Sequence, residues 1–508
     1  MGTARLAPSP TGIAAPLSAM ETRSVFAYPG LLIELIDRHW ELLYTLLVVV
    51  GLVIYVVASH SLHQRRHPAA AIAWVLGILL MPIVVLPLYL AFGSRKVHLR
   101  QANHGAVRKA AAAVAPHYAN SRQTTANRSQ QLGVAMGLPP AVAYDALQVH
   151  ADGEQALAAL HRVIDGAQQT LEVSTFIFSR DALGEAVAEH LKRKAQAGVR
   201  VRLLIDGIGI YLGGLPDIAG LSAAGVEVVR FVPPFRSPKR GRTNLRNHRK
   251  LVVADRQILW CGGRNLAGEY FTADLRPLIG GRAWLDLSFD LSGELAAQAA
   301  LQFEEDWAFA TERLLPEIPL APPLPPAENT SALAQLVPSG PDRVDDTILT
   351  LLVSAGFTSR RRILAVTPYF VPDPSLISSL ALAARRGVQV DLVLPRRSNH
   401  RLADFARHRG LRELVSAGAR VWLHPRMVHA KAVVVDEELA LVGSANLDGR
   451  SLFLNYELMV AFYDRRAVRD FSRWIDERRR ESTVYHAERP GVLRELAEGL
   501  LLWLAFQL

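Results

Sequence analysis

Two copies of one short residue pattern constrain this chain more than any other feature of its sequence. The first copy reads HRKLVVAD, from His248 to Asp255, and the second reads HAKAVVVD, from His429 to Asp436. The His, Lys and Asp of the second copy each lie 181 residues after their counterparts, as His429 does after His248. A step of small residues and asparagine follows both, as GGRN and GSAN. One copy alone would carry little weight, whereas two in register predict an internal duplication.

The segments that precede the two cassettes repeat one order of expected elements. Apolar runs and amphipathic stretches predict strand, helix and strand at 170–178, 183–199 and 199–206, and again at 362–371, 376–388 and 388–395. Both helices end in the same AxxGV junction. Units of this kind build parallel or mixed sheets. We therefore expect an α/β fold with two similar α-β-α halves packed about a pseudo-two-fold axis.

The cassettes predict a shared site. Residues i and i+2 of a strand face the same side, so His248 and Lys250 project together, as do His429 and Lys431. If the halves pack about a two-fold axis, both pairs meet in one cleft. Two histidines on opposite sides of a phosphorus atom supply a nucleophile and a general acid, and the lysines stabilise the phosphoryl charge.

The residues after each cassette are candidates for substrate binding. Asn265 and Asn446 would donate hydrogen bonds to phosphoryl oxygens, and the small Gly263 and Ser444 would let the backbone approach a ligand. Neither cassette carries the carboxylate cluster that magnesium or calcium requires, so we expect no metal and no other cofactor.

The N-terminal part is expected to enter a membrane. The uncharged stretch 42–59 is close to the length that crosses a bilayer, and 68–94 is a second uncharged stretch. They predict a transmembrane helical hairpin over 39–95, with Pro82 and Pro87 kinking its second helix. Two buried helices of a soluble domain are the alternative, but such helices usually carry a polar stripe.

Charge bears on the partner and on orientation. The net charge is +10 and the pI is about 9.8, which favours an anionic partner, either nucleic acid or an anionic lipid surface. More basic residues follow the second apolar stretch than lie in the loop before it, which favours a cytoplasmic position for the rest of the chain. The single cysteine, Cys261, excludes an intramolecular disulfide and a cysteine-based zinc site.

Composition divides the chain into six expected parts. These are an unstructured segment 1–38, the hairpin 39–95, a polar linker 96–135, a first half 136–318, a proline-rich linker 319–335 and a second half 336–508. The apolar end 500–508 is expected to lie on the bilayer surface or to pack against the second half.

The duplicated pattern HxK(x)4D(x)6G[GS]xN resembles the phospholipase D superfamily. The amino-acid sequence at 244–255, 262–271, 367–372 and 429–457 resembles that of bacterial cardiolipin synthases, and the resemblance extends from the hairpin to the end of the chain. That resemblance implies a membrane-embedded, multi-pass protein of the bacterial inner membrane, with its catalytic domains in the cytoplasm. It also implies phosphatidylglycerol as the anionic lipid partner, with no nucleic acid.

The resemblance also implies a reaction. One histidine attacks the phosphodiester of phosphatidylglycerol, glycerol leaves, and a hydroxyl of a second phosphatidylglycerol attacks the phosphatidyl-histidine to give cardiolipin. By analogy His248 is the nucleophile and His429 the acid and base, although the sequence leaves their order open. Asp286, in WLD, and Glu457, in NYE, match carboxylates that orient the histidines.

The remaining candidates are less specific. Asp255 and Asp436 belong to the catalytic motif, but we expect them to act structurally at the strand ends. Arg246 and Arg450 are candidates for guiding anionic headgroups. One departure from the family follows Asp206, where the chain reads GIGIYLGG and many synthases carry a Gly-Ser step. It leaves the shape of that loop open.

Three other functions compete with the synthase. A phospholipase D that passes the phosphatidyl group to water or a small alcohol would use the same residues. A nuclease would suit the basic charge, although it gains little from membrane spans. A non-catalytic scaffold would not need both cassettes intact. The exact donor and acceptor and the oligomeric state stay open.

Overall fold

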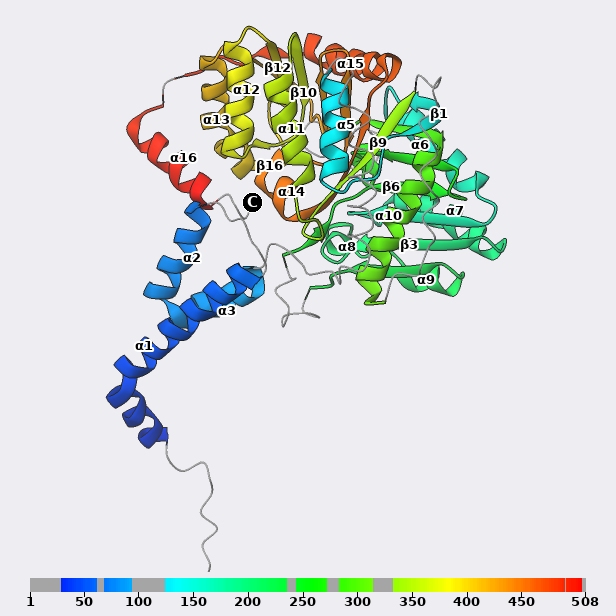
Figure 1. Ribbon diagram of the computed structural model, residues 1–508. Helices are drawn as coiled ribbons and strands as arrows, with labels where there is room; N and C mark the ends of the chain where they lie inside the picture. The colour runs from blue at the N-terminus through cyan, green and yellow to red at the C-terminus, as the bar shows by residue number, and fades with distance from the viewer. Residues whose placement is uncertain are drawn as a thin grey trace, which may run out of the picture.

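The computed structural model describes residues 29–61, 68–93, 124–234, 244–271, 283–313, 332–488 and 490–504. Residues 1–28 of the expected unstructured segment lie outside this description, but residues 29–38 form the start of a helix, so the expectation is wrong for them. Most of the polar linker and of the proline-rich linker also lies outside the description. Three helices project from a globular body that contains both cassettes (Figure 1).

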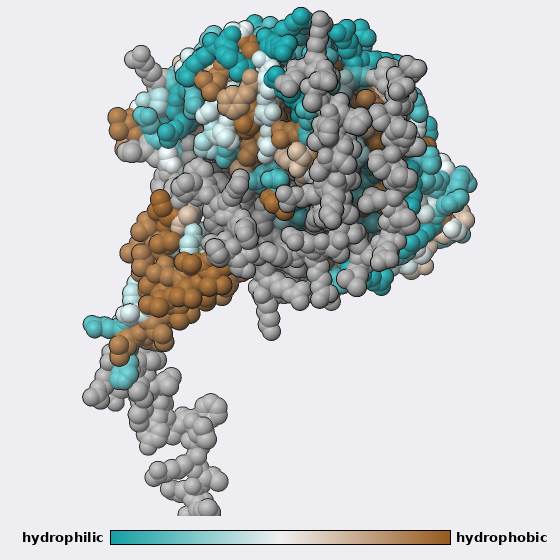
Figure 2. Space-filling view, viewed as in Figure 1, coloured by the Kyte–Doolittle hydropathy of each residue, from teal (hydrophilic) through white to brown (hydrophobic). Residues whose placement is uncertain are grey.

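The projecting helices are α1 (Pro29–Ser61), α2 (Pro68–Leu80) and α3 (Pro82–Phe92). Among the described residues, His39–Val57 within α1 is the one helical segment long and apolar enough to cross a membrane. The surface of these helices is strongly hydrophobic, whereas the coloured parts of the body in the same view are mixed, with many hydrophilic residues (Figure 2).

The expectation of one kinked second helix is wrong. The helix stops at Leu80, and Met81, with φ −145°, separates α2 from α3. Proline disfavours the helical conformation in the residue before it, so Pro82 begins a new helix. Pro87 lies inside α3 without ending it. The break divides the second apolar stretch into two helices, each too short to span a bilayer unaided.

The first half contains β1 (Val142–Val149), α6 (Gly153–Gly166), β2 (Thr170–Thr175), α7 (Ala182–Gln196), β3 (Arg200–Asp206), α8 (Gly209–Leu212), α9 (Ile218–Ala223), β4 (Glu227–Phe231), β5 (Arg246–Asn247), β6 (Leu251–Ala254), β7 (Ile258–Gly262), η3 (Gly268–Tyr270), β8 (Ser288–Gly293) and α10 (Glu294–Thr311). The second contains β9 (Leu333–Ser339), α11 (Thr347–Thr358), β10 (Arg362–Val366), β11 (Phe370–Val371), α12 (Pro374–Arg385), β12 (Gln389–Pro395), α13 (Arg401–Ser416), β13 (Arg420–His424), β14 (Ala432–Val435), β15 (Leu439–Gly443), β16 (Leu447–Asp448), α14 (Gly449–Phe453), β17 (Asn455–Phe462), α15 (Arg465–Arg480), β18 (Thr483–Val484) and α16 (Val492–Leu504).

The strands of the two halves join in one sheet. β1 and β9 pair antiparallel at its centre, with Val142 opposite Ala334. Outward from this pair the order is β8-β7-β6-β2-β3-β4 on one side and β17-β15-β14-β10-β12-β13 on the other. Apart from the short β18, which pairs beyond β13, the two series match strand for strand, which confirms the duplicated α/β fold and its pseudo-two-fold arrangement.

Helices cover both faces of the sheet. Residues of α10 and α15 form a core that is shared by the halves, in which the rings of Phe289 and Phe471 lie 5.3 and 4.9 Å from that of Phe462. The opposite face carries two separate cores, one under α6 and α7 and one under α11, α12 and α13. Since aromatic pairs of this geometry add stability beyond their buried area, the halves behave as one packed body.

The polar linker ends earlier than expected. Residues Thr125–Ala135 form helix α5, whose N-terminus is capped by the Thr124 side chain. The amide of Thr125 also donates to Glu438 of the second half at 2.6 Å. The sequence of α5 has no strong apolar face, so its helix depends on contacts with the distant α11 and with that carboxylate.

Candidate active site

Both cassettes begin at the same edge of the sheet. β6 runs antiparallel to β2 with Leu251 opposite Ser174, and β14 runs antiparallel to β10 with Ala432 opposite Val366. The residues just before β6 and β14 therefore lie at the carboxyl ends of β2 and β10. This register places both histidine-lysine pairs at one edge, close to the pseudo-two-fold axis.

Each histidine contacts a carboxylate from the opposite half. His248 Nδ1 lies 2.9 Å and 3.0 Å from the two carboxylate oxygens of Glu457, which belongs to the second half. His429 Nδ1 lies 2.6 Å from Oδ2 of Asp286, which belongs to the first. The exchange makes one site from two halves, because each cassette histidine takes its carboxylate partner from the other half.

Backbone pairing across the halves fixes this exchange. The amide of His248 donates to the carbonyl of Tyr456 at 2.9 Å, next to the parallel pairing of β5 with β17. The amide of His429 donates to the carbonyl of Leu285 at 2.6 Å, beside a bridge between Leu285 and Val428. Each histidine and its carboxylate are thus held by neighbouring backbone segments.

The lysines are buried beside the histidines. Lys250 donates to the carbonyl of His248 at 2.8 Å, while Lys431 Nζ lies 2.7 and 3.0 Å from the two ring nitrogens of His429. Burial lowers the pKa of Lys250 to about 7 and that of Lys431 to about 8, against the attraction of Glu457 and Asp286. A phosphate anion between the two lysines would raise the pKa of each and so keep both ammonium groups protonated.

Burial also keeps the histidines neutral. Burial, together with the charges of the neighbouring lysines, lowers the pKa of His248 to about 4 and that of His429 to about 3, although the carboxylates oppose this shift. Although burial favours a protonated carboxyl, His429 and Lys431 hold the pKa of Asp286 at about 2. The pKa of Glu457 is lowered in the same way, against its own burial. Ionised carboxylates accept the Nδ1 proton, so the lone pair of each ring is on Nε2.

Gly263 and Ser444 lie against the orienting carboxylates. Ser444 donates to Glu457 at 2.5 Å, and a Cβ added to Gly263 would lie 2.3 Å from Oδ1 of Asp286. In the described residues these two positions make room for a carboxylate, and their expected approach to a ligand stays a prediction. A glycine beside Asp286 and a serine beside Glu457 are small enough to leave room for these carboxylates.

The asparagines differ from one another. Asn265 donates to the hydroxyl of Tyr270 at 2.8 Å and accepts from the amide of Ile177 at 3.3 Å, so it fixes two neighbouring segments. Asn446 hydrogen-bonds to Asp448, while its buried Oδ1 has no hydrogen-bond partner among the described residues. Both are positioned by protein contacts, which favours a structural role for Asn265 over substrate binding.

The motif aspartates lie away from the histidines. The carboxylate of Asp255 accepts from the amides of residues 168, 169 and 170 at 2.7, 2.6 and 2.8 Å, and that of Asp436 accepts from the amides of 360–362. Both have left-handed backbones, with φ near 52° and 54°. The four residues of β6, Leu251–Ala254, separate Asp255 from Lys250, a distance of roughly 15 Å. Asp255 and Asp436 cap the far ends of β6 and β14, which agrees with the structural role expected of them at the strand ends and not with a place among the catalytic residues.

The two arginine candidates serve the fold as well. Arg246 is buried and pairs with Asp206 at 3.3 Å, and Arg450 donates to the side chain and carbonyl of Asn244 at 3.2 Å each. Both side chains hold the segment that leads into the first cassette, so neither contact favours headgroup guidance.

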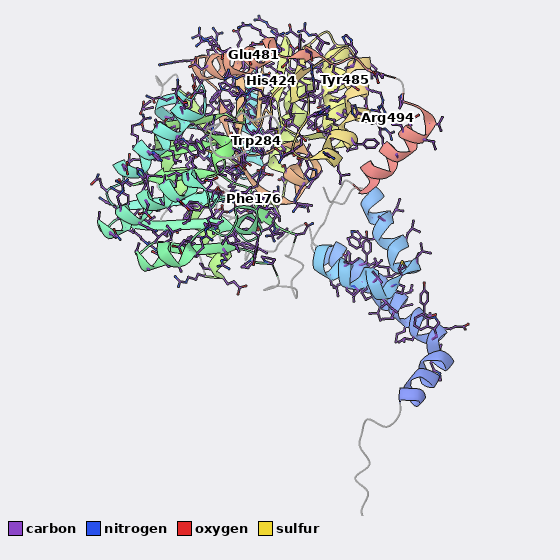
Figure 3. All side chains as sticks on the ribbon, turned by 180° about the vertical axis from the view of Figure 1, so that it is seen from behind. Phe176, Trp284, His424, Glu481, Tyr485 and Arg494 are labelled. Atoms are coloured by element: carbon purple, nitrogen blue, oxygen red, sulfur yellow. The ribbon has the colours of Figure 1, made fainter. Side chains whose placement is uncertain are left out.

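Sequence reasoning missed an aromatic wall around the histidines. The ring of Phe176 lies 5.2 Å from that of His248, and the rings of Tyr270 and Trp284 lie 4.9 and 5.6 Å from that of His429. Phe176 and Trp284 are labelled near the junction of the halves in Figure 3. The one sequence signal for this wall was the position of Trp284, two residues before the expected histidine-orienting carboxylate of Asp286.

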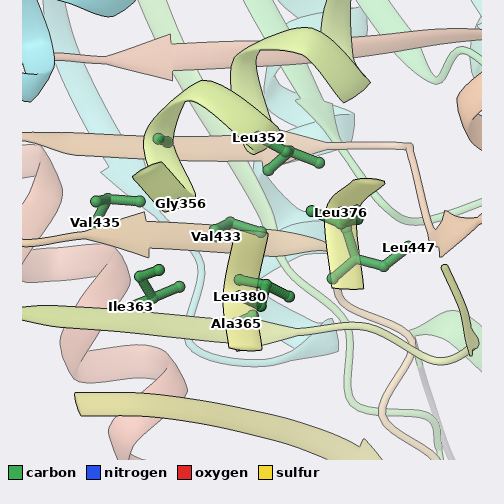
Figure 4. A pocket seen from close by; sticks show the side chains of 10 residues that line it. Leu352, Gly356, Ile363, Ala365, Leu376, Leu380, Val433, Val435 and Leu447 are labelled. Atoms are coloured by element: carbon green, nitrogen blue, oxygen red, sulfur yellow. The ribbon is translucent and has the colours of Figure 1, made fainter. Parts of the chain in front are cut away.

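One pocket of the second half is lined by apolar residues and carries no group for polar chemistry. The pocket in Figure 4 lies under α11 and α12 and is lined by apolar residues of the second half: Leu352, Ala355, Gly356, Ile363, Ala365, Leu376, Leu380, Val433, Val435 and Leu447. In the described part of the chain, no group of three or more His, Cys, Asp or Glu side chains is arranged to hold a metal ion.

A duplicated α/β fold with two histidine-lysine cassettes in one site defines a two-domain phospholipase D-like protein. The family model "Cardiolipin synthase, PLD-like domain" matches residues 160–307 and 352–479, and the model "Phospholipase_D-nuclease N-terminal" matches 46–94. The chain belongs to the cardiolipin synthase family.

Individual relatives agree with this assignment. The chain is 34% identical to cardiolipin synthase A of Pseudomonas aeruginosa over 82% of this chain and 86% of that one. It is 32% identical to cardiolipin synthase A of Pseudomonas putida (strain GB-1) over 83% and 88%. The crystal structure of phosphatidylserine synthase from Haemophilus influenzae has the same fold, with a TM-score of 0.57 at 14% identity over 76% of this chain and all of that one.

Proposed function

We propose that the chain is a cardiolipin synthase that transfers a phosphatidyl group from one phosphatidylglycerol to another and releases glycerol. The observation that carries this proposal is the pair of histidines, each oriented by a carboxylate of the opposite half and flanked by a lysine. Membership of the cardiolipin synthase family supports the choice of lipid.

In the first step, Nε2 of His248 attacks the phosphorus of the donor lipid. A P–N bond forms, the P–O bond to the headgroup glycerol breaks, and His429 gives a proton to the leaving oxygen. In the second step a glycerol hydroxyl of the acceptor lipid attacks the phosphorus. His429 takes the hydroxyl proton, the P–N bond breaks, and cardiolipin leaves with both histidines restored.

The lysines stabilise the charge that develops on the phosphoryl oxygens. The phosphodiester anion would also raise the pKa of His429 from its low value in the empty site, which it must do if this histidine is to act as an acid. Lys431, which contacts both ring nitrogens of His429, would turn to the phosphate and release Nε2.

Geometry supports His248 as the nucleophile. Among the described residues, its hydrogen bonds engage Nδ1 and leave Nε2 open, whereas Nε2 of His429 lies 3.0 Å from Lys431. A neutral imidazole with an open Nε2 is the form that attacks phosphorus. The same arrangement would serve either order of steps, so the assignment needs its own test.

The proposal includes a membrane-embedded, multi-pass chain with its catalytic halves in the cytoplasm. α1 supplies one span, and α2 and α3 together would re-enter the bilayer as a broken second segment. The basic residues that follow the second apolar stretch favour this orientation.

A product assay tests the function. Purified protein receives glycerol-labelled phosphatidylglycerol in vesicles with a chelator, and lipids and glycerol are measured. We expect cardiolipin and glycerol in equal amounts. Phosphatidic acid as the sole lipid product would instead favour hydrolysis, and a strict requirement for added divalent metal would contradict the mechanism.

A further inference from the structure

The loop after β3 exposes an unusual concentration of apolar side chains. Outside α1–α3, eleven large apolar residues of the described chain are exposed, and four of them lie within the eight residues 208–215. They are Ile208, Tyr211, Leu212 and Leu215, with 37%, 54%, 63% and 54% exposure. We name these four residues the α8 rim. Such clustering on a surface marks an interaction site.

The α8 rim is held directly against the catalytic edge. Asp206 accepts hydrogen bonds from the amides of Ile208 and Gly209 at 2.8 and 3.2 Å, and from the amide of Asn247 at 2.8 Å, one residue before His248. A Cβ added to Gly209 would lie 1.6 Å from the carbonyl oxygen of Phe176, so the loop packs on the strand end whose ring contacts His248.

The conformation of the rim is costly. Leu215 has a left-handed backbone with φ 58°, which is unfavourable for a branched side chain that gains nothing from burial. Strain of this kind persists where the surroundings fix it, often at functional surfaces.

The duplication supplies an internal comparison. The equivalent loop of the second half follows β12 and reads RRSNHR, with exposed Arg396, Arg397 and Arg401. The fold itself therefore does not require an apolar loop at this place. Apolar character is specific to the half that carries His248.

We infer that the α8 rim inserts into the lipid bilayer beside the active site and contacts the acyl region of the donor lipid. This inference rests on the proposed lipid substrate. α8 lies on the lower side of the globular body in Figure 1, the side toward which α1–α3 project, and Phe176 lies below Trp284 in Figure 3. A rim that is apolar, exposed and next to an anchored membrane segment fits the hydrocarbon boundary better than water.

A site-specific fluorophore tests this directly. Because Cys261 is buried, a cysteine at Leu212→Cys is readily labelled with an environment-sensitive dye. The full-length protein is placed in phosphatidylglycerol vesicles with or without nitroxide-labelled lipid. We expect a blue shift and loss of fluorescence at position 212. The matched control is Phe357→Cys, since Phe357 is half-exposed at the end of α11, near the strand ends capped by Asp436; its label should not be quenched.

Activity gives a second readout. The Tyr211→Ser and Leu212→Ser double variant should raise the KM for vesicle substrate roughly tenfold or more while kcat is kept, and Phe357→Ser should change neither. An unquenched label at 212, or a spectral change that depends on protein concentration without lipid, would overturn the inference. If cardiolipin forms while the label at position 212 stays unquenched, the insertion of the α8 rim is refuted and the proposed function stands. If the label is quenched but no cardiolipin forms, the proposed function is refuted and the insertion of the rim stands.

Discussion

Replacing Glu457 by glutamine removes the charge that orients His248 while keeping the shape of the side chain. Glu457 is fully buried and accepts from His248, Ser444 and Asn455, the last at 3.2 Å. A hydrogen bond to a charged group contributes about 1.5–3 kcal/mol, so its loss should lower kcat roughly 10- to 150-fold. The loss grows if the amide selects the wrong tautomer of the imidazole.

The pH dependence separates this reason from a general loss of structure. The Glu457 charge raises the pKa of His248, so Glu457→Gln should lower that pKa below about 4 and move the acid limb of kcat/KM to lower pH. His248 is already neutral at pH 7, so raising the pH should not recover the rate. The same charge raises the pKa of Lys250, so the variant should bind substrate less well at pH 7.

Initial rates in vesicles between pH 4 and pH 9 measure these effects. The matched control is Glu172→Gln, since Glu172 is also buried and ion-paired, with Arg202 at 3.0 Å, but contacts neither histidine. It should alter thermal stability and leave kcat unchanged. A Glu457→Gln variant that keeps kcat within about twofold, with an unmoved acid limb of the kcat/KM profile, would refute the reasoning. The loss of a hydrogen bond to a charged group should lower kcat by more than that.

Three further outcomes are expected. Asp286→Asn should lower kcat by a factor similar to that of Glu457→Gln, measured in the same assay, because Asp286 holds His429 as Glu457 holds His248. Asp255→Asn should lower the free energy of unfolding by about 1–3 kcal/mol with little change in kcat, as measured by thermal melts and initial rates. Although partial burial opposes the shift, three amide donors hold the pKa of the Asp255 carboxyl below its usual range. The stabilisation is therefore present above the usual carboxyl pKa and is lost as the pH falls through the folded-state pKa. Arg249→Met should cost about 3–5 kcal/mol by leaving Asp306 buried without its partner, and Arg249→Met with Asp306→Leu should regain part of that loss.

The cassettes made the fold and the shared site predictable from sequence. A repeat in register fixes two halves, and the strand that directly follows His248 and Lys250 fixes which edge they occupy. The carboxylates of Asp286 and Glu457 came from family resemblance, because nothing local in the sequence ties them to a histidine of the other half. The contacts of Gly263 and Ser444 with these carboxylates could not be predicted for the same reason: the carboxylates are distant in sequence or belong to another strand.

Local patterns also failed where chain breaks or long-range contacts decide the outcome. Hydropathy could not distinguish a kinked helix from the break at Met81, since both sides of the break are equally apolar. Helix α5 lacks a clear apolar face and takes its stability from α11, more than 200 residues away in the sequence. The aromatic wall of Phe176, Tyr270 and Trp284 likewise gathers residues from three separate segments.

The most direct test of the account is to trap the covalent intermediate. Purified protein is mixed with phosphatidylglycerol, quenched within the first turnover and digested, and the peptides are analysed by mass spectrometry. The account predicts a phosphatidyl group on His248, formed with one equivalent of glycerol and absent from His248→Ala. A phosphatidyl group on His429 would reverse the two roles, and cardiolipin formed without any modified histidine would contradict the mechanism.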